Sequence, residues 1–229
     1  MTKTTEYVIG LDLGQLSDRT ALSVIEDVTT AAPAFVGQLT PDTDVYKRPE
    51  AAMYACRHLQ VWNPGTQHTD VLRDVVALLQ TPPMRSEPNK RFGATVEVHV
   101  AIDVTVSGPF TARMFTDALQ EASDNVSITT FEIVSGLTQT GNPYGSVRVP
   151  KRDLASLLRV LLESKRLVIA QGIQHGATLR SEISNFKAEK ITPDDSVLDW
   201  RTREHDDLVL ATALALWMFE KRGRAFFYG

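Results

Sequence analysis

Four aspartates lie at the ends of apolar stretches, where a carboxylate can bind a metal ion or take part in catalysis. Asp12 and Asp103 each follow an apolar, β-branched stretch, and the adjacent pair Asp206 and Asp207 opens an apolar run. A carboxylate at the end of a buried strand is partly removed from water, which is costly unless it binds a cation or hydrogen-bond donors. Mg²⁺ and Mn²⁺ prefer such oxygen ligands, and two ions held by shared carboxylates can hydrolyse a phosphodiester. Together the aspartates therefore indicate a two-metal site.

Each aspartate also has an ordinary structural explanation. Asp12 alone fits a turn, and Asp103 alone fits a cap at a strand end. The pair at 206–207 fits a helix N-terminus, where acids complement the macrodipole and cap free N–H groups. It is the joint placement of the acids at element ends that favours the metal site.

Helical spacing separates the two members of the pair. Asp207 shares a helical face with Leu210, Ala211 and Leu214, so a helix packed by that stripe would direct Asp207 inward. Asp206 lies about 100° around the helix axis from Asp207. It is expected to cap the helix or to support the metal ligands without binding the metal directly. The assignment reverses if the helix begins one residue later.

The elements that must position these acids follow from apolar periodicity. Strands are predicted at 6–14, 20–28 and 34–39, joined too closely for parallel crossovers and so forming an antiparallel meander. Residues 40–65 follow no clear pattern. Further strands are predicted at 95–103, 127–134 and 166–170, and helices at 68–80, 109–122, 150–164, 176–188 and 206–222. Ser107 is expected to cap the second helix, which Pro109 begins. The fold class is therefore α/β: a mixed sheet, antiparallel and then parallel, flanked by helices.

Composition and charge narrow the class of protein. The 229 residues suit one α/β domain spanning 1–229, with no linker that would divide it. One cysteine excludes an intrachain disulfide and a cysteine-based zinc site and favours a reducing cytoplasm, and no stretch of 18 apolar residues suits a membrane span. Residues 1–145 hold 10 Lys+Arg against 17 Asp+Glu, whereas residues 146–190 hold 9 against 4. One basic segment thus lies within an acidic chain.

Several stretches resemble the nuclease domain of the large terminase subunit of tailed phages, in the RNase H-like, RuvC-like superfamily. They are "YVIGLDLGQLSDRTALSVIE", "VHVAIDVTVSGPFTARMF", "VRVPKRDLASLLRVLLESKRLVIA" with "ATLRSEISNF", and "HDDLVLATALALW". The resemblance implies an RNase H-like fold and a Mg²⁺- or Mn²⁺-dependent endonuclease, encoded by a phage or prophage, that cuts double-stranded DNA during packaging in the bacterial cytoplasm. It implies a portal and a small terminase subunit as partners.

The resemblance places the catalytic positions on Asp12, Asp103 and Asp207, with Asp206 beside them as a further metal ligand. In the expected mechanism Asp12 bridges two ions, and Asp103 and Asp207 each complete one coordination sphere. His205 and Asp18 are auxiliary candidates, although an incidental surface role and a turn are their simpler explanations, and Glu182 is expected on a helix surface. A DNA-contacting rim is expected from five basic residues: Arg148, Lys151, Arg152, Lys165 and Arg166.

The chain departs from the family pattern in three places. Leu210 stands where a second aspartate often follows "DLV", and "VTVSGPF" is bulkier than the usual loop after the second acid, although Gly108 could still allow close approach of DNA. No G-x-x-x-x-G-K-[ST] motif occurs. Either the chain is an excised or separately encoded nuclease domain, whose packaging ATPase lies elsewhere, or its function is not packaging.

Three other functions remain open. A RuvC-type Holliday-junction resolvase shares the fold and acids but would need a dimer and a preference for four-way junctions. A phosphotransferase of the actin and sugar-kinase superfamily shares "GLDLG" but needs two such domains, for which 229 residues are too few. A degenerate RNase H-like module would bind a partner without cutting, and Leu210 is its best support.

Overall fold

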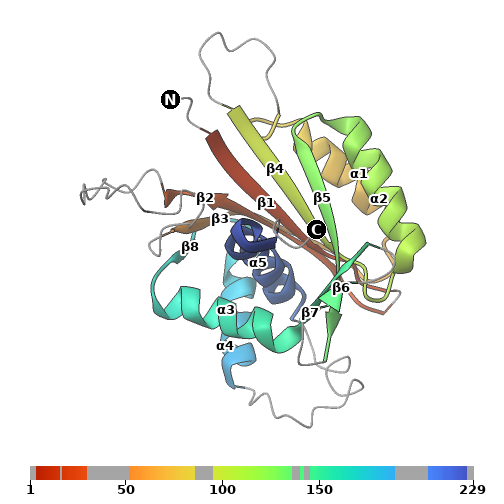
Figure 1. The fold of residues 1–229 in the computed structure, drawn as a ribbon. Coiled ribbons are helices and arrows are strands. Elements are labelled where there is room, and N and C mark those ends of the chain that lie inside the picture. Colours follow the sequence, from red (N-terminus) through yellow and green to blue (C-terminus); the bar gives the residue numbers. More distant parts are fainter. Residues whose placement is uncertain are drawn as a thin grey trace.

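The computed structural model describes residues 4–15, 17–29, 52–85, 95–135, 140–141, 145–188 and 206–225. In this part of the chain, eight strands form one mixed sheet in the order β6-β7-β5-β4-β1-β2-β3-β8 (Figure 1). The strands are β1 Thr4–Asp12, β2 Thr20–Asp27, β3 Tyr54–Trp62, β4 Thr95–Asp103, β5 Val126–Val134, β6 Thr140–Gly141, β7 Val147–Pro150 and β8 Leu167–Ile169. The helices are α1 His68–Leu79, α2 Gly108–Ala122, α3 Lys151–Glu163, α4 Gly176–Ala188 and α5 Asp207–Ala225.

The direction of the strands changes at β1. On one side, β1, β2 and β3 form an antiparallel meander. On the other side, β4 is parallel to β1 and β5 is parallel to β4. This confirms the expected α/β class, an RNase H-like mixed sheet flanked by helices. It also brings the carboxyl ends of β1 and β4 to one edge of the sheet, where ligands of open α/β sheets usually bind.

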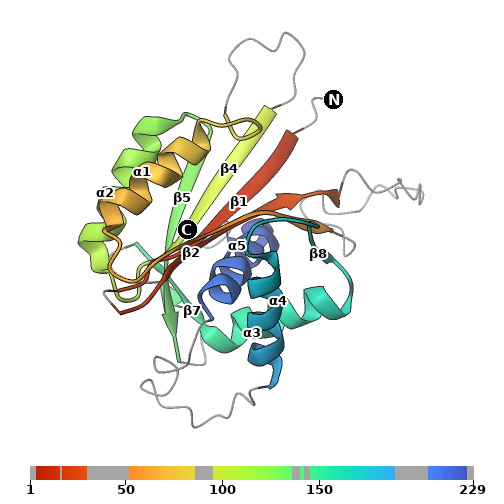
Figure 2. The same cartoon turned by 180° about the vertical axis from the view of Figure 1, so that it is seen from behind.

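Two helical layers cover the sheet, α1 and α2 on one face and α3, α4 and α5 on the other (Figure 1, Figure 2). Alternate residues of β1 face alternate layers, because successive strand side chains point to opposite faces. Ile9 and Leu11 pack with α1 and α2, whereas Val8 packs with the α5 layer. Gly10 and Asp12 therefore face the α5 layer too.

Helix α5 lies directly against the centre of the sheet and is buried from Asp207 to Phe219. Its backbone touches β1 at Gly10, where an added Cβ would lie 1.9 Å from the carbonyl oxygen of Ala211. No residue larger than glycine fits there without displacing the helix. The contact fixes the position of α5 along β1.

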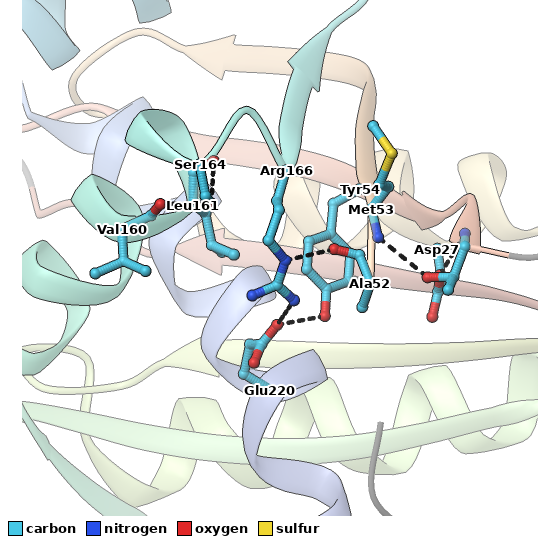
Figure 3. Close-up of polar contacts among 10 residues, drawn as sticks. Asp27, Ala52, Met53, Tyr54, Val160, Leu161, Ser164, Arg166 and Glu220 are labelled. Carbon is cyan, nitrogen blue, oxygen red and sulfur yellow. Dashed lines mark hydrogen bonds and ion pairs between the residues drawn. The ribbon is translucent and has the colours of Figure 1, made fainter. Parts of the chain in front are cut away.

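A polar cluster holds the far end of α5 against the sheet (Figure 3). Glu220 accepts hydrogen bonds from the Arg166 guanidinium at 2.6 Å and the Tyr54 hydroxyl at 2.7 Å. Arg166 also donates to the carbonyl of Ala52 at 2.6 Å. The cluster ties α5 to the start of β3 and to the residue before β8.

Most predicted elements are present within two or three residues of their expected limits. The third strand differs: β3 is Tyr54–Trp62, inside the stretch that showed no clear pattern. The strand expected at 34–39 lies outside the described residues. The short strands β6 and β7 were not predicted. Within the described ranges, no helix is long and apolar enough to cross a membrane.

Candidate active site

The pairing of β1 with β4 brings two of the predicted aspartates together. Asp12 and Asp103 are direct register partners on these parallel strands, and each is the last residue of its strand. Register partners on parallel strands point to the same face, so both carboxylates lie on the α5 side. Asp12 is half-buried and Asp103 is buried.

Asp103 is held in place by the turn that follows β4. Its Oδ1 accepts a hydrogen bond from the Thr105 amide at 2.9 Å and a second from the Thr105 hydroxyl. The same hydroxyl accepts a hydrogen bond from the Ile133 amide at 2.7 Å, which connects the turn to β5. Thr105 was not singled out from the sequence, although Asp-x-Thr after a strand is a typical side-chain-to-backbone turn.

Asp207, the first residue of α5, lies near the same edge. It precedes Ala211 by about one helical turn and so shares the helical face that meets β1. Asp12 lies two residues beyond Gly10, at the end of β1 that is on the same side as the start of α5. The contact between Gly10 and Ala211 therefore aligns Asp207 with Asp12, and Asp207 faces inward as expected from its spacing.

The N-terminus of α5 is capped by an acid from another helix. Glu182 of α4 accepts hydrogen bonds from the amides of Leu208 and Val209 at 3.1 and 3.3 Å. The expectation that Glu182 lies on a helix surface is wrong, because its side chain is buried. A usable sequence signal was its position between Leu179 and Ile183, on the apolar face of α4.

One cavity of about 210 Å³ contains all of these carboxylates except that of Glu182. Its acidic lining residues are Asp12, Asp18, Asp103, Asp206 and Asp207. We call it the acidic cavity. The three aspartates predicted to be catalytic therefore share one space, and Asp18 reaches it from the exposed turn between β1 and β2.

Burial and mutual repulsion favour the protonated form of these acids. Removal from water, followed by the charges of Asp103 and Asp207, raises the pKa of Asp12 well above its usual value. Burial raises the pKa of Asp103 to about 6, although the hydrogen bonds from Thr105 oppose the rise. Burial and the Asp18 charge raise the pKa of Asp207 to about 7. A bound cation would relieve this cost.

Asp206 is engaged in an ion pair. Its Oδ2 lies 2.6 Å from Nζ of Lys151, at the start of α3, and Lys151 is also 5.7 Å from the ring centroid of Phe186 on α4. Asp206 precedes α5, but the amides of Leu208 and Val209 donate their hydrogen bonds to Glu182. The pair joins the starts of α3 and α5 beside the acidic cavity.

The other basic residues expected to contact DNA are spread over the molecule. Arg166 binds Glu220 (Figure 3), which lies 13 residues beyond Asp207 and hence about 20 Å along α5. Lys165 is at the end of α3 that lies away from Lys151. The structure therefore does not bring Arg166 and Lys165 to the acidic cavity, because Arg166 contacts the far part of α5 and Lys165 follows the far end of α3.

Arg148 and Arg152 lie on separate elements. The Arg148 Nε atom is 2.9 Å from Glu132 on β5, and the Arg152 Nε atom is 3.4 Å from Asp153. His205 lies outside the described residues. The Ser107 side chain makes no capping hydrogen bond to α2, contrary to expectation, whereas Pro109 does occupy the first turn.

The site's chemistry fits a hard divalent cation, although the carboxylates would have to move. The facing side chains are all oxygen donors. Oδ2 of Asp207 is buried and has no hydrogen-bond partner in the described part of the chain. Among the described residues, no three Asp, Glu, His or Cys side chains are grouped closely enough to hold an ion as they stand. Ion binding would therefore require the aspartates to turn toward a common centre.

Comparison with known proteins finds similarity only among solved structures. No protein-family model and no curated protein matches the chain. The human cytomegalovirus terminase nuclease domain, in a Mn-soaked, inhibitor-bound form, aligns over 95% of this chain and 83% of its own. The identity is 10% and the TM-score 0.48, too low to transfer residues or activity. The likeness therefore carries no conclusion about what this chain does.

Proposed function

We propose that this chain is a metal-dependent endonuclease that hydrolyses phosphodiester bonds in double-stranded DNA. The observation that carries the proposal is the meeting of Asp12 and Asp103, direct partners on β1 and β4, with Asp207 of α5 in one cavity. Carboxylates from three separate elements, held together against their mutual repulsion, are costly to keep unless cations bind there. Such a set suits phosphodiester hydrolysis.

Two Mg²⁺ or Mn²⁺ ions, when bound, would activate the attacking water and stabilise the leaving oxygen. Asp12 would help to hold both ions, because it shares the acidic cavity with Asp103, its partner on β4, and with Asp207 of α5. Asp103 and Asp207 would each hold one ion. Thr105 keeps the Asp103 carboxylate in position, and Glu182 keeps the start of α5, and thereby Asp207, in position.

The finer proposal is that the DNA is cut during phage genome packaging. It is supported by the stretches that resemble the terminase nuclease, above all "HDDLVLATALALW". In that setting the ATP-driven movement of DNA would come from an ATPase outside this sequence, and a portal and small terminase subunit would direct the DNA to the site.

Incubation with supercoiled plasmid and Mg²⁺ or Mn²⁺ tests the activity. We expect the wild type to nick and linearise the plasmid, and Asp103→Asn to lower the rate by at least about 100-fold, because it removes a charged metal ligand. The matched control is Glu121→Gln, which changes an exposed acid on α2 and should leave the rate unchanged.

Two outcomes contradict the proposal. If wild type and Asp103→Asn are equally inert on linear, supercoiled and branched DNA, the chain is not a nuclease under these conditions and the degenerate binding module is favoured. If cleavage occurs only at four-way junctions, the resolvase is the better description.

A further inference from the structure

A second cavity continues from the acidic cavity along the starts of α1 and α2. We call it the α1/α2 groove, and its volume is about 630 Å³. Gly14, Gln15, Ser17 and Val106 line both spaces. The two cavities are therefore contiguous, and a ligand whose reacting bond lies at the aspartates can extend into the groove.

The groove differs in charge from the acidic cavity. Its described lining holds no aspartate or glutamate, whereas five aspartates line its neighbour. Hydroxyl and amide side chains take their place, among them Ser17, Thr66, Gln67 and Thr111. A polyanion that leaves the metal site through this groove meets neutral hydrogen-bond donors and avoids further carboxylates.

One aromatic ring stands out at the groove. Phe110, in the first turn of α2, is 83% exposed, and Val106 beside it is 37% exposed. Phe110 and Met114, one turn further along α2, both line the groove. The groove therefore offers an open aromatic face on which a base can stack, beside neutral donors that can contact phosphate oxygens.

We propose that the α1/α2 groove binds the DNA strand next to the scissile phosphodiester and that Phe110 stacks on a base of that strand. The proposal rests on the proposed nuclease function. Stacking requires a base face to be accessible, so the groove favours DNA that is unpaired or locally opened beside the cut. Every base has such a face, so the contact tolerates any sequence.

Fluorescence anisotropy with labelled DNA tests the groove. Ca²⁺ replaces Mg²⁺, because its looser coordination favours binding without cleavage. Two probes are compared: a fully paired duplex and the same duplex with a short single-stranded gap. We expect Phe110→Ala to weaken binding of the gapped DNA about tenfold, with a smaller effect on the paired duplex. Phe110→Trp, which keeps a stacking surface, should bind like the wild type.

Val160→Ala is the matched control, because Val160 is a 55% exposed apolar residue on α3, in the other helical layer. It should bind both probes like the wild type. The proposal is overturned if Phe110→Ala binds gapped DNA as tightly as the wild type, or if it weakens both probes equally. If the wild type cuts plasmid but Phe110→Ala binds gapped DNA normally, the role of Phe110 is wrong and the proposed nuclease function stands. If the wild type never cuts plasmid, the proposed function itself is wrong.

Discussion

Glu182 performs, from a different helix, the task that an N-cap residue usually performs within its own helix. The first amides of a helix lack intrahelical partners, and in α5 two of them donate to Glu182. Asp206, the residue in the capping position, has its carboxylate paired with Lys151. The position of Asp207 therefore depends on α4 as well as on α5.

Removing the acceptor should loosen the start of α5. We expect Glu182→Ala to lower the free energy of unfolding by about 2 kcal/mol, because two buried amides lose their acceptor. It should also weaken Mn²⁺ binding, measured by calorimetry below the melting temperature. Glu182→Gln keeps an acceptor oxygen and should recover most of both losses. If Glu182→Ala melts and binds Mn²⁺ like the wild type, Glu182 does not position Asp207.

At this scale the sequence predicted which aspartates share the acidic cavity better than it predicted the residues that hold them in place. Asp12, Asp103 and Asp207 were predicted because each sits at the end of an apolar element. Glu182 was missed because its partners are backbone amides far away in the chain, and no local spacing reveals such a contact. Charge along the chain likewise did not show that Lys165 and Arg166, two of the five basic residues expected to contact DNA, lie away from the acidic cavity.

At the scale of the elements, the seating of α5 on β1 determines whether the third aspartate reaches the other two. The helix approaches so closely at Gly10 that a methyl group would meet the Ala211 carbonyl. The cluster around Glu220 holds the other end of the same helix (Figure 3). Helix α5 is thus fixed at two points along its length.

Gly10→Ala should displace α5 from the sheet. We expect a loss of about 3 kcal/mol in unfolding free energy and a melting temperature lower by about 5–10 °C, because the clash is with backbone. Mn²⁺ affinity should fall as well. Gly176→Ala is the control, since its added Cβ would meet only side-chain atoms, the nearest at 3.0 Å. Equal melting temperatures for the two variants would show that the contact at Gly10 is unimportant.

Most elements were predictable because their apolar periodicity is clean, as in β4 and α1. β3 was not, because Arg57, His58 and Gln60 interrupt its apolar positions. Its place in the sheet comes from pairing with β2 on one side and β8 on the other. Partners that lie distant in the chain thus outweigh a weak local pattern.

At the scale of the whole molecule, acidic side chains with raised pKa values gather at one edge of the sheet. The pKa values of Asp103, Asp207 and Glu182 are raised to about 6, 7 and 7, and that of Asp12 is raised well above its usual value. In the unfolded chain these acids ionise near pH 4. Between about pH 4 and 7 the folded state therefore binds more protons than the unfolded state.

Stability without metal should accordingly fall as the pH rises. We expect the melting temperature in EDTA to drop by several degrees between pH 5 and pH 8. Mn²⁺ should raise it more at pH 8 than at pH 5, since protons and cations compete for the same oxygens. Asp103→Asn should flatten the pH dependence. A melting temperature that rises steadily from pH 5 to pH 8 in EDTA would contradict the assignment of these acids.

The place of α5 in the chain also bears on how the protein is made. On the ribosome, β1 and β4 emerge long before the residues of α5, so an incomplete chain holds Asp12 and Asp103 but lacks Asp207. Glu182 likewise has no amides to cap until α5 has been synthesised. The proposed hydrolysis, which uses all three aspartates, would therefore begin only after α5 has docked against β1.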